Sequence, residues 1–155
     1  MPTTGPSVED VSLPPEHREA VHRNGVVEIG PFHQTINQDF VRVYVQRTPL
    51  MHELVANFRV LQEVRTLHKR LYVLVVVDRS AAPPSAAQRR LVADWEREHG
   101  ATAIAMVAPG NPLFVITMKL VFRALNLFQS KPRPSAFFAT EAEAKVWLDA
   151  QRSCT

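Results

Sequence analysis

The side chains that could do chemistry in this chain are six histidines, one cysteine and a few carboxylates and hydroxyls. A metal site built on local motifs needs its ligands at characteristic spacings, such as HExxH or paired cysteines. The histidines have neither spacing: His17, His22, His33, His52, His68 and His99. Cys154 lies at the end of the sequence, where a nucleophile is poorly held. We therefore predict no metal, no cofactor and no catalytic nucleophile.

Phosphate-binding and hydrolase motifs are also missing from the sequence. The five glycines are scattered singly, so they form no phosphate loop, and there is no GxSxG motif. Asp78 follows an apolar run and would lie at the carboxyl end of a central strand, where open α/β sheets bind their ligands. It is also explained as the residue that closes the strand and bonds to the next loop. We expect a protein without enzymatic activity.

The composition predicts an ordinary globular domain. The chain has 155 residues, 46% hydrophobic and 21% charged, which excludes disorder throughout. A net charge of +3 is too small for a dedicated nucleic-acid surface, so we expect no nucleic-acid partner. The start has no basic segment followed by an apolar stretch, which predicts no signal peptide and a cytoplasmic location, with the option of peripheral contact with a membrane.

The hydrophobic pattern changes from strand to helix period several times. Residues 40–46, FVRVYVQ, alternate as in a half-buried strand and are expected to pair antiparallel with VVEI at 26–29. LYVLVVV is a continuous apolar run typical of a strand that is covered on both faces. Three helix starts have capping residues, at Thr48-Pro49, Ser85 and Thr140. The predicted strands are 26–29, 40–46, 71–77, 102–108 and 136–139, and the predicted helices are 48–70, 86–100, 112–128 and 141–152.

The order of these elements, β-β-α-β-α-β-α-β-α, predicts a single α/β domain. Its sheet should have five strands, be mostly parallel and carry an antiparallel strand at one edge. We place this domain at residues 25–152. Residues 1–24 hold four prolines and are predicted to form a loosely ordered N-terminal arm, with a short helix from Pro15 that stops at Asn24-Gly25.

The helix predicted at 112–128 has more apolar residues than one buried face requires. At 100° per residue, Lys119, Arg123 and Asn126 share a polar sector, and the opposite sector should face the sheet. That sector contains Thr117, Val121, Ala124 and Phe128. Two apolar flanks remain, one with Leu113, Leu120 and Leu127, and the other with Met118, Phe122 and Leu125. Either neighbouring helices cover both flanks, or an exposed flank has a function.

Three segments resemble the bacterial SpoIIAA-like proteins of the STAS-like superfamily, which share a fold with CRAL-TRIO lipid-carrier domains. They are YVLVVVDRSAAPPSAAQRRL, the apolar helix 112–128 and the ending FFATEAEAKVWLDAQR. The resemblance covers roughly residues 25 to 152 and implies the STAS-like fold. It also implies a phosphorylated serine at the start of the second helix, as in anti-sigma factor antagonists. Ser85 is the nearest match and Ser80 a poorer one, and neither is followed by the family's glycine.

Two functions follow as hypotheses. The first is binding of an apolar or lipid-like ligand, or of an anionic membrane surface, through helix 112–128. The second is a regulatory protein-interaction module with Ser85 as its switch, which binds a protein partner or a second copy of the chain. The residues expected to contact ligand or membrane are Leu113, Met118, Lys119, Leu120, Phe122, Arg123, Leu125, Leu127, Lys131 and Arg133. The sequence identifies no particular ligand or partner.

Overall fold

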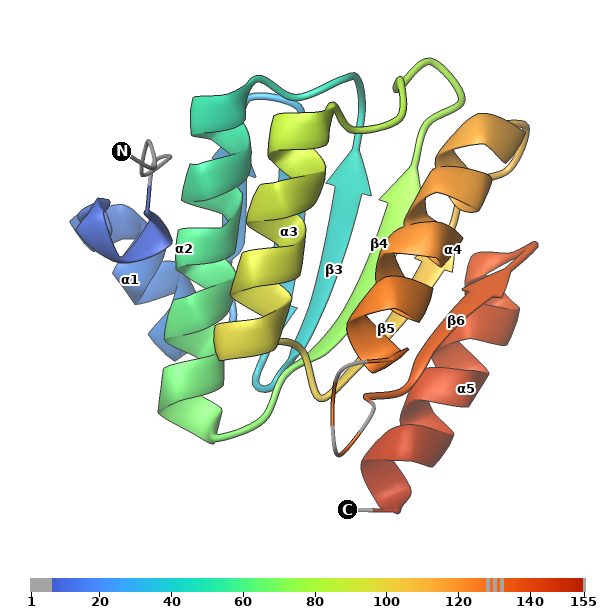
Figure 1. Cartoon of the computed structure of the whole chain (residues 1–155). Coiled ribbons are helices and arrows are strands. Elements are labelled where there is room, and N and C mark those ends of the chain that lie inside the picture. The colour runs from blue at the N-terminus through green and yellow to red at the C-terminus, as the bar shows by residue number, and fades with distance from the viewer. Residues whose placement is uncertain (1–6, 128, 130, 132, 155) are drawn as a thin grey trace.

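The computed structural model describes residues 7–127, 129, 131 and 133–154, and within them the chain forms an α/β fold with a six-stranded sheet (Figure 1). The prediction of an α/β fold with a mostly parallel sheet is confirmed in this coarse form. The strands are β1 (Val26–Ile29), β2 (Phe32–Asn37), β3 (Phe40–Val45), β4 (Tyr72–Val77), β5 (Ala103–Val107) and β6 (Ser135–Phe138). The helices are η1 (Val8–Asp10), α1 (Pro15–Arg23), α2 (Met51–His68), α3 (Ala86–Glu98), α4 (Pro112–Leu127) and α5 (Glu141–Ser153).

The sheet has the strand order β1-β2-β3-β4-β5-β6, and one of its strands was not predicted. β2 lies between β1 and β3 and pairs antiparallel with both, so the predicted pairing of 26–29 with 40–46 is wrong. The remaining pairs are parallel. The FHQTIN segment does alternate, but one of its buried positions is Gln34, and a polar residue there hides the strand pattern. Gly30, at φ +53°, makes the tight turn that joins β1 to β2.

The two faces of the sheet are covered differently. Helices α2, α3 and α4 lie over one face, and among the described helices α5 is the one that covers β4, β5 and β6 on the other (Figure 1). Ala103 and Ala105 of β5 are small, so α5 approaches closely and buries Ala144 and Leu148 almost completely. The side under α5 is therefore tightly packed.

The helix boundaries agree with most of the predicted caps. Ser85 and Gln88 form the predicted capping box of α3, and the Thr140 hydroxyl accepts a hydrogen bond from Glu143 N at the start of α5. The start of α2 differs, since Leu50 rather than Thr48 is its N-cap and donates its N–H to the Glu53 carboxylate. Thr48 Oγ1 instead accepts a hydrogen bond from Ala82 N, so it joins two loops.

The segment predicted as a loose arm is structured from residue 7 onward. Within residues 7–24, η1 and α1 pack beside α2, and Val8 and Val21 are buried. Arg59 of α2 also donates a hydrogen bond to the carbonyl of Val11. The short helix predicted from Pro15 is confirmed, and it ends at Asn24 in the left-handed conformation. Residues 1–6 of the predicted arm lie outside the described residues.

Asp39, in the turn between β2 and β3, forms two ion pairs at one end of the sheet. Its carboxylate is 3% exposed and lies 2.6 Å from Arg70 and 2.6 Å from Arg152, so it links the end of α2 to α5. Its backbone carbonyl accepts a hydrogen bond from Tyr72 N. The two guanidinium groups are partly exposed, which limits the strength of each pair.

We expect Asp39→Ala to lower the free energy of unfolding by about 2 kcal/mol, because it leaves two neighbouring cations without their shared carboxylate. Urea denaturation followed by circular dichroism measures this. Asp149→Ala is the matched control, since Asp149 is an exposed carboxylate on α5 whose side chain has no partner among the described residues. Equal midpoints for the two variants would show that the Asp39 pairs contribute little.

Candidate functional site

An apolar cleft lies between the sheet and helices α2, α3 and α4. Its cavity volume is about 100 Å³. Val75 of β4 and Ile104 of β5 form part of its floor and are only half-buried, although they belong to central strands. Figure 1 shows α3 and α4 diverging over this part of the sheet. The helical layer therefore leaves the middle of the sheet incompletely covered.

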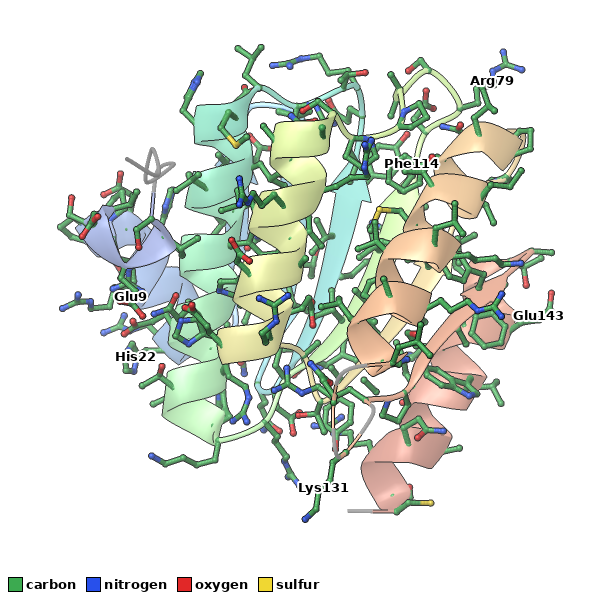
Figure 2. All side chains as sticks on the ribbon, viewed as in Figure 1. Glu9, His22, Arg79, Phe114, Lys131 and Glu143 are labelled. Carbon is green, nitrogen blue, oxygen red and sulfur yellow. The ribbon has the colours of Figure 1, made fainter. Side chains whose placement is uncertain are left out.

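The walls of the cleft are almost entirely apolar. Phe58 of α2 and Trp95 of α3 stack with their ring centroids 4.7 Å apart. Met118 and Phe122 line the cleft from α4, and Phe114 lies at the upper end of that helix (Figure 2). A cleft with such walls would bind hydrocarbon or aromatic groups by the hydrophobic effect.

The polar residues that line the cleft already have partners within the protein. Asn57 Oδ1 accepts from Gln34 Nε2 at 2.5 Å, and Gln88 Nε2 donates to the carbonyl of Pro49 at 2.8 Å. Glu96 Oε2 accepts from Ala101 N at 3.2 Å. Trp95 Nε1 is the exception, because it is buried and has no hydrogen-bond acceptor among the described residues. The indole N–H is thus left to donate to an oxygen atom of a bound molecule.

Helix α4 is rotated relative to the prediction. Its buried residues are Met118, Phe122 and Leu125, at 3%, 7% and 7% exposure, so this flank faces the sheet. Of the sector predicted to face the sheet, Ala124 is exposed and Thr117 and Val121 are half-buried, and Phe128 lies outside the described residues. The large side chains of Met, Phe and Leu cover more sheet surface than Thr, Val and Ala, which explains the rotation.

The other apolar flank of α4 is exposed. Leu113, Ile116, Leu120 and Leu127 are 66%, 56%, 62% and 73% exposed, and they form a row that we call the leucine ridge. The ridge borders a groove between the outer surfaces of α3 and α4, which we call the outer groove. Its lining residues are Arg89, Arg90, Ala93 and Arg97 of α3, Thr117, Leu120, Val121, Ala124 and Leu125 of α4, and Gln129.

The predicted cationic contacts do not form one cluster. Lys119 Nζ lies 5.5 Å from the ring centroid of Phe137 on the β6 side of α4, and Arg123 lines a shallow hollow on the same side. Arg133 Nη1 donates to the backbone carbonyl of Glu96 at 2.6 Å, which joins the segment after α4 to the end of α3. Lys131 is exposed and lies beyond the lower end of α4 (Figure 2).

Ser85 and Asp78 both have structural roles in the loops. The Ser85 hydroxyl accepts from Gln88 N and caps α3. Asp78 Oδ2 accepts from both the N–H and the hydroxyl of Ser80, and these hydrogen bonds lower the pKa of the Asp78 carboxyl. The Asn111 side chain donates to the carbonyls of Asp78 and Ala81, so the loops at this edge of the sheet hold one another.

One group of possible metal ligands occurs among the described residues. Glu9 of η1 and Glu98 and His99 at the end of α3 bring one ligand atom each within 4.8 Å of the others. The two carboxylates are exposed, and His99 Nε2 lies 3.2 Å from Glu9, as expected for a surface ion pair.

Comparisons of the chain with protein-family models, with curated proteins and with solved structures found no match. Within the described residues, no helix has the length and apolar character needed to cross a bilayer. The candidate site therefore rests on its own geometry.

The buried carboxyl of Glu96 should make stability depend on pH. Burial raises its pKa to about 7, against the ordinary 4.5, and the Ala101 N–H and the Arg133 charge oppose this rise. Between these two values the folded state holds a proton that the unfolded state has released. Stability is therefore greatest below about pH 4.5 for this group, falls as the pH rises to about 7, and is constant above that.

We expect the advantage of Glu96→Gln over the wild type in free energy of unfolding to grow between pH 5 and pH 7.5, by on the order of 3 kcal/mol. Urea denaturation at several pH values measures the difference, and the comparison cancels contributions that the two proteins share. Glu98→Gln, an exposed neighbour, is the control. A gap that stays constant across this range would place the Glu96 carboxyl in contact with water.

Proposed function

We propose that this protein binds an apolar, chain-like molecule in the cleft beneath α4. The observation that carries the proposal is the half-buried floor formed by Val75 and Ile104. Residues of central strands are normally covered. Full burial of a large apolar side chain stabilises the fold by about 1.5–3 kcal/mol, and a half-buried side chain gains only part of this free energy. A bound hydrocarbon would recover this free energy by covering the floor.

The chemistry of the cleft limits the class of ligand. The cavity volume of about 100 Å³ is below the range of about 300–1,000 Å³ that is usual for small-molecule sites, so a ligand needs further room, which an outward movement of α4 would supply. Asn57, Gln88 and Glu96 are already hydrogen-bonded, and a charged group placed among the apolar walls would lose its hydration without compensation. The ligand is therefore a neutral apolar chain or ring, or the apolar part of a larger molecule, with at most one oxygen near Trp95 Nε1.

For a ligand to enter the cleft, α4 moves outward from the sheet. This helix covers the cleft with one flank, through Met118 and Phe122, while its opposite flank is exposed. Moving it outward breaks apolar contacts on that one flank, and the ligand replaces them. Ligand binding then shifts the population toward the open position.

The order of the elements after β2 supports membership in the STAS-like superfamily, which the sequence resemblance first indicated. We include the SpoIIAA-like family assignment in the proposal. The cleft itself does not depend on that assignment, because a fold can hold unrelated sites.

The first experiment is native mass spectrometry of the freshly purified protein, followed by organic extraction. We expect an adduct that disappears after delipidation, and the extract identifies its class. A protein that shows only the apo mass and then binds none of a panel of fatty acids, fatty alcohols and sterols would contradict the proposal.

The second experiment uses Trp95 as a reporter, because it lines the cleft while the second tryptophan, Trp147, packs on Phe138 on the far face of the sheet. In a Trp147→Phe background, dibromostearic acid should quench Trp95 on binding. Val75→Phe fills the floor and should weaken binding by about tenfold or more, since even one methylene in a hydrophobic pocket is worth about 10–200-fold. Val146→Phe, at an exposed site on α5, is the matched control.

Quenching that Val75→Phe leaves unchanged would mean that the fatty acid binds elsewhere. Circular dichroism and the free energy of unfolding report whether Val75→Phe folds. We expect its stability to be equal to or above that of the wild type, because the new ring enters unfilled space.

A further inference from the structure

We propose that the outer groove and the leucine ridge form a docking site for an acidic amphipathic helix of a protein partner. The groove and the cleft lie on different sides of α4, so this inference goes beyond the proposed ligand binding and does not depend on it.

The groove has room for a helix because small residues stand where α3 and α4 face each other. Ala93 of α3 and Ala124 of α4 line it, with Thr117 further along. An α-helix with side chains is about 10 Å across, and it packs with its side-chain ridge in the groove of its neighbours. Two adjacent helices with alanines on their facing sides offer such a groove.

One wall of the groove is cationic. Arg89, Arg90 and Arg97 lie on the side of α3 toward α4, and all three are exposed. Arg97 lies 3.4 Å from Asp94 in an exposed pair, which contributes little. Helix α4 has no acidic residue in its sequence, so nothing on the opposite wall neutralises the arginines. The groove therefore complements negative charge.

The other wall is α4, where Leu120 lines the groove and belongs to the exposed leucine ridge beside it. Leu113, Leu120 and Leu127 are seven residues apart, which is about two helical turns, and they project along one line. A heptad spacing of leucines is the pattern with which a helix packs against a partner helix. The ridge runs beside the arginines, so the complementary partner has a row of apolar residues next to a row of Asp or Glu.

A second copy of this chain fits less well. Packing α4 of one copy into the groove of another would bring Lys119 and Arg123 toward Arg89, Arg90 and Arg97, and like charges repel. A flat anionic membrane would contact the ridge but leave the groove floor at Ala93 and Ala124 unfilled.

The test uses two synthetic helical peptides with the same row of leucines. One has glutamate beside the leucines, and the other has lysine at the same positions. Fluorescence anisotropy with the full chain, delipidated, should give binding of the glutamate peptide at least about tenfold tighter than of the lysine peptide at low salt. The difference should shrink as salt is added, because the charges are exposed.

A charge reversal makes the test specific. The triple variant Arg89→Glu, Arg90→Glu and Arg97→Glu should reverse the preference and bind the lysine peptide more tightly. Leu120→Asn should weaken the binding of both peptides. Val146→Asn, at a similarly exposed apolar site on α5, should leave the binding of both peptides unchanged. Because the mutated residues are all exposed, circular dichroism should show unchanged folding.

Four results would overturn the inference. Equal affinity for the two peptides, or no binding of the glutamate peptide, would show that the arginines do not select an acidic partner. Co-sedimentation with phosphatidylcholine–phosphatidylglycerol vesicles that Leu120→Asn abolishes would assign the ridge to a membrane. A dimer in light scattering that Leu120→Asn dissociates would assign it to a second copy. None of these results bears on quenching of Trp95 by a ligand in the cleft.

Discussion

The structure depends on how completely each face of one sheet is covered. Strands β4 and β5 are apolar on both faces, so both faces of the sheet need a helical layer there. Under α5, the alanines of β5 let a single helix approach until Ala144 and Leu148 are fully buried. On the other face three helices share the task, and larger side chains such as Phe58, Trp95 and Phe122 hold them away from the middle of the sheet. The cleft is the result of that difference.

Helix α4 has an unusual position in this arrangement because it is apolar on more than one side. Its inner flank covers the cleft, its α3-facing side lines the outer groove, and its outward leucines contact no other part of the described chain closely enough to be buried. Core packing explains only the inner flank. The free energy of burial that Leu113, Leu120 and Leu127 forgo is not recovered within the fold, which is why we assign the ridge to a partner.

Much of the fold could be predicted from the sequence. Capping residues gave the starts of α3 and α5, and continuous apolar runs gave β4 and β5. β2 was missed because Gln34 is buried through its bond to Asn57 of α2, a partner 23 residues away that no local pattern shows. The same limit explains the error in the orientation of α4. Helical periodicity defines the flanks of a helix, but the identity of the flank that meets the sheet is a tertiary question.

The candidate site was predictable only in part, for the same reason. The sequence indicated that α4 had apolar surface to spare, and the exposed leucines agree with one of the two explanations offered for it. It did not indicate the cleft, because Val75 and Ile104 look like ordinary core residues until the separation of α3 and α4 is known. The arginines of α3 were likewise missed, since three cations on a surface helix are usually only solvated.

The two proposed sites share α4, and this has a thermodynamic consequence. In our proposal a ligand in the cleft would move α4 away from the sheet, and that movement would change the distance between Ala124 and Ala93, which line the outer groove. A partner helix in the groove contacts both walls and so favours one separation of α3 and α4. Each occupant then alters the affinity of the other, and the two effects must be equal in free energy. The sign depends on which position of α4 the partner prefers. A partner that prefers the outward position would dock more tightly when the cleft is filled, and one that prefers the inward position would dock less tightly.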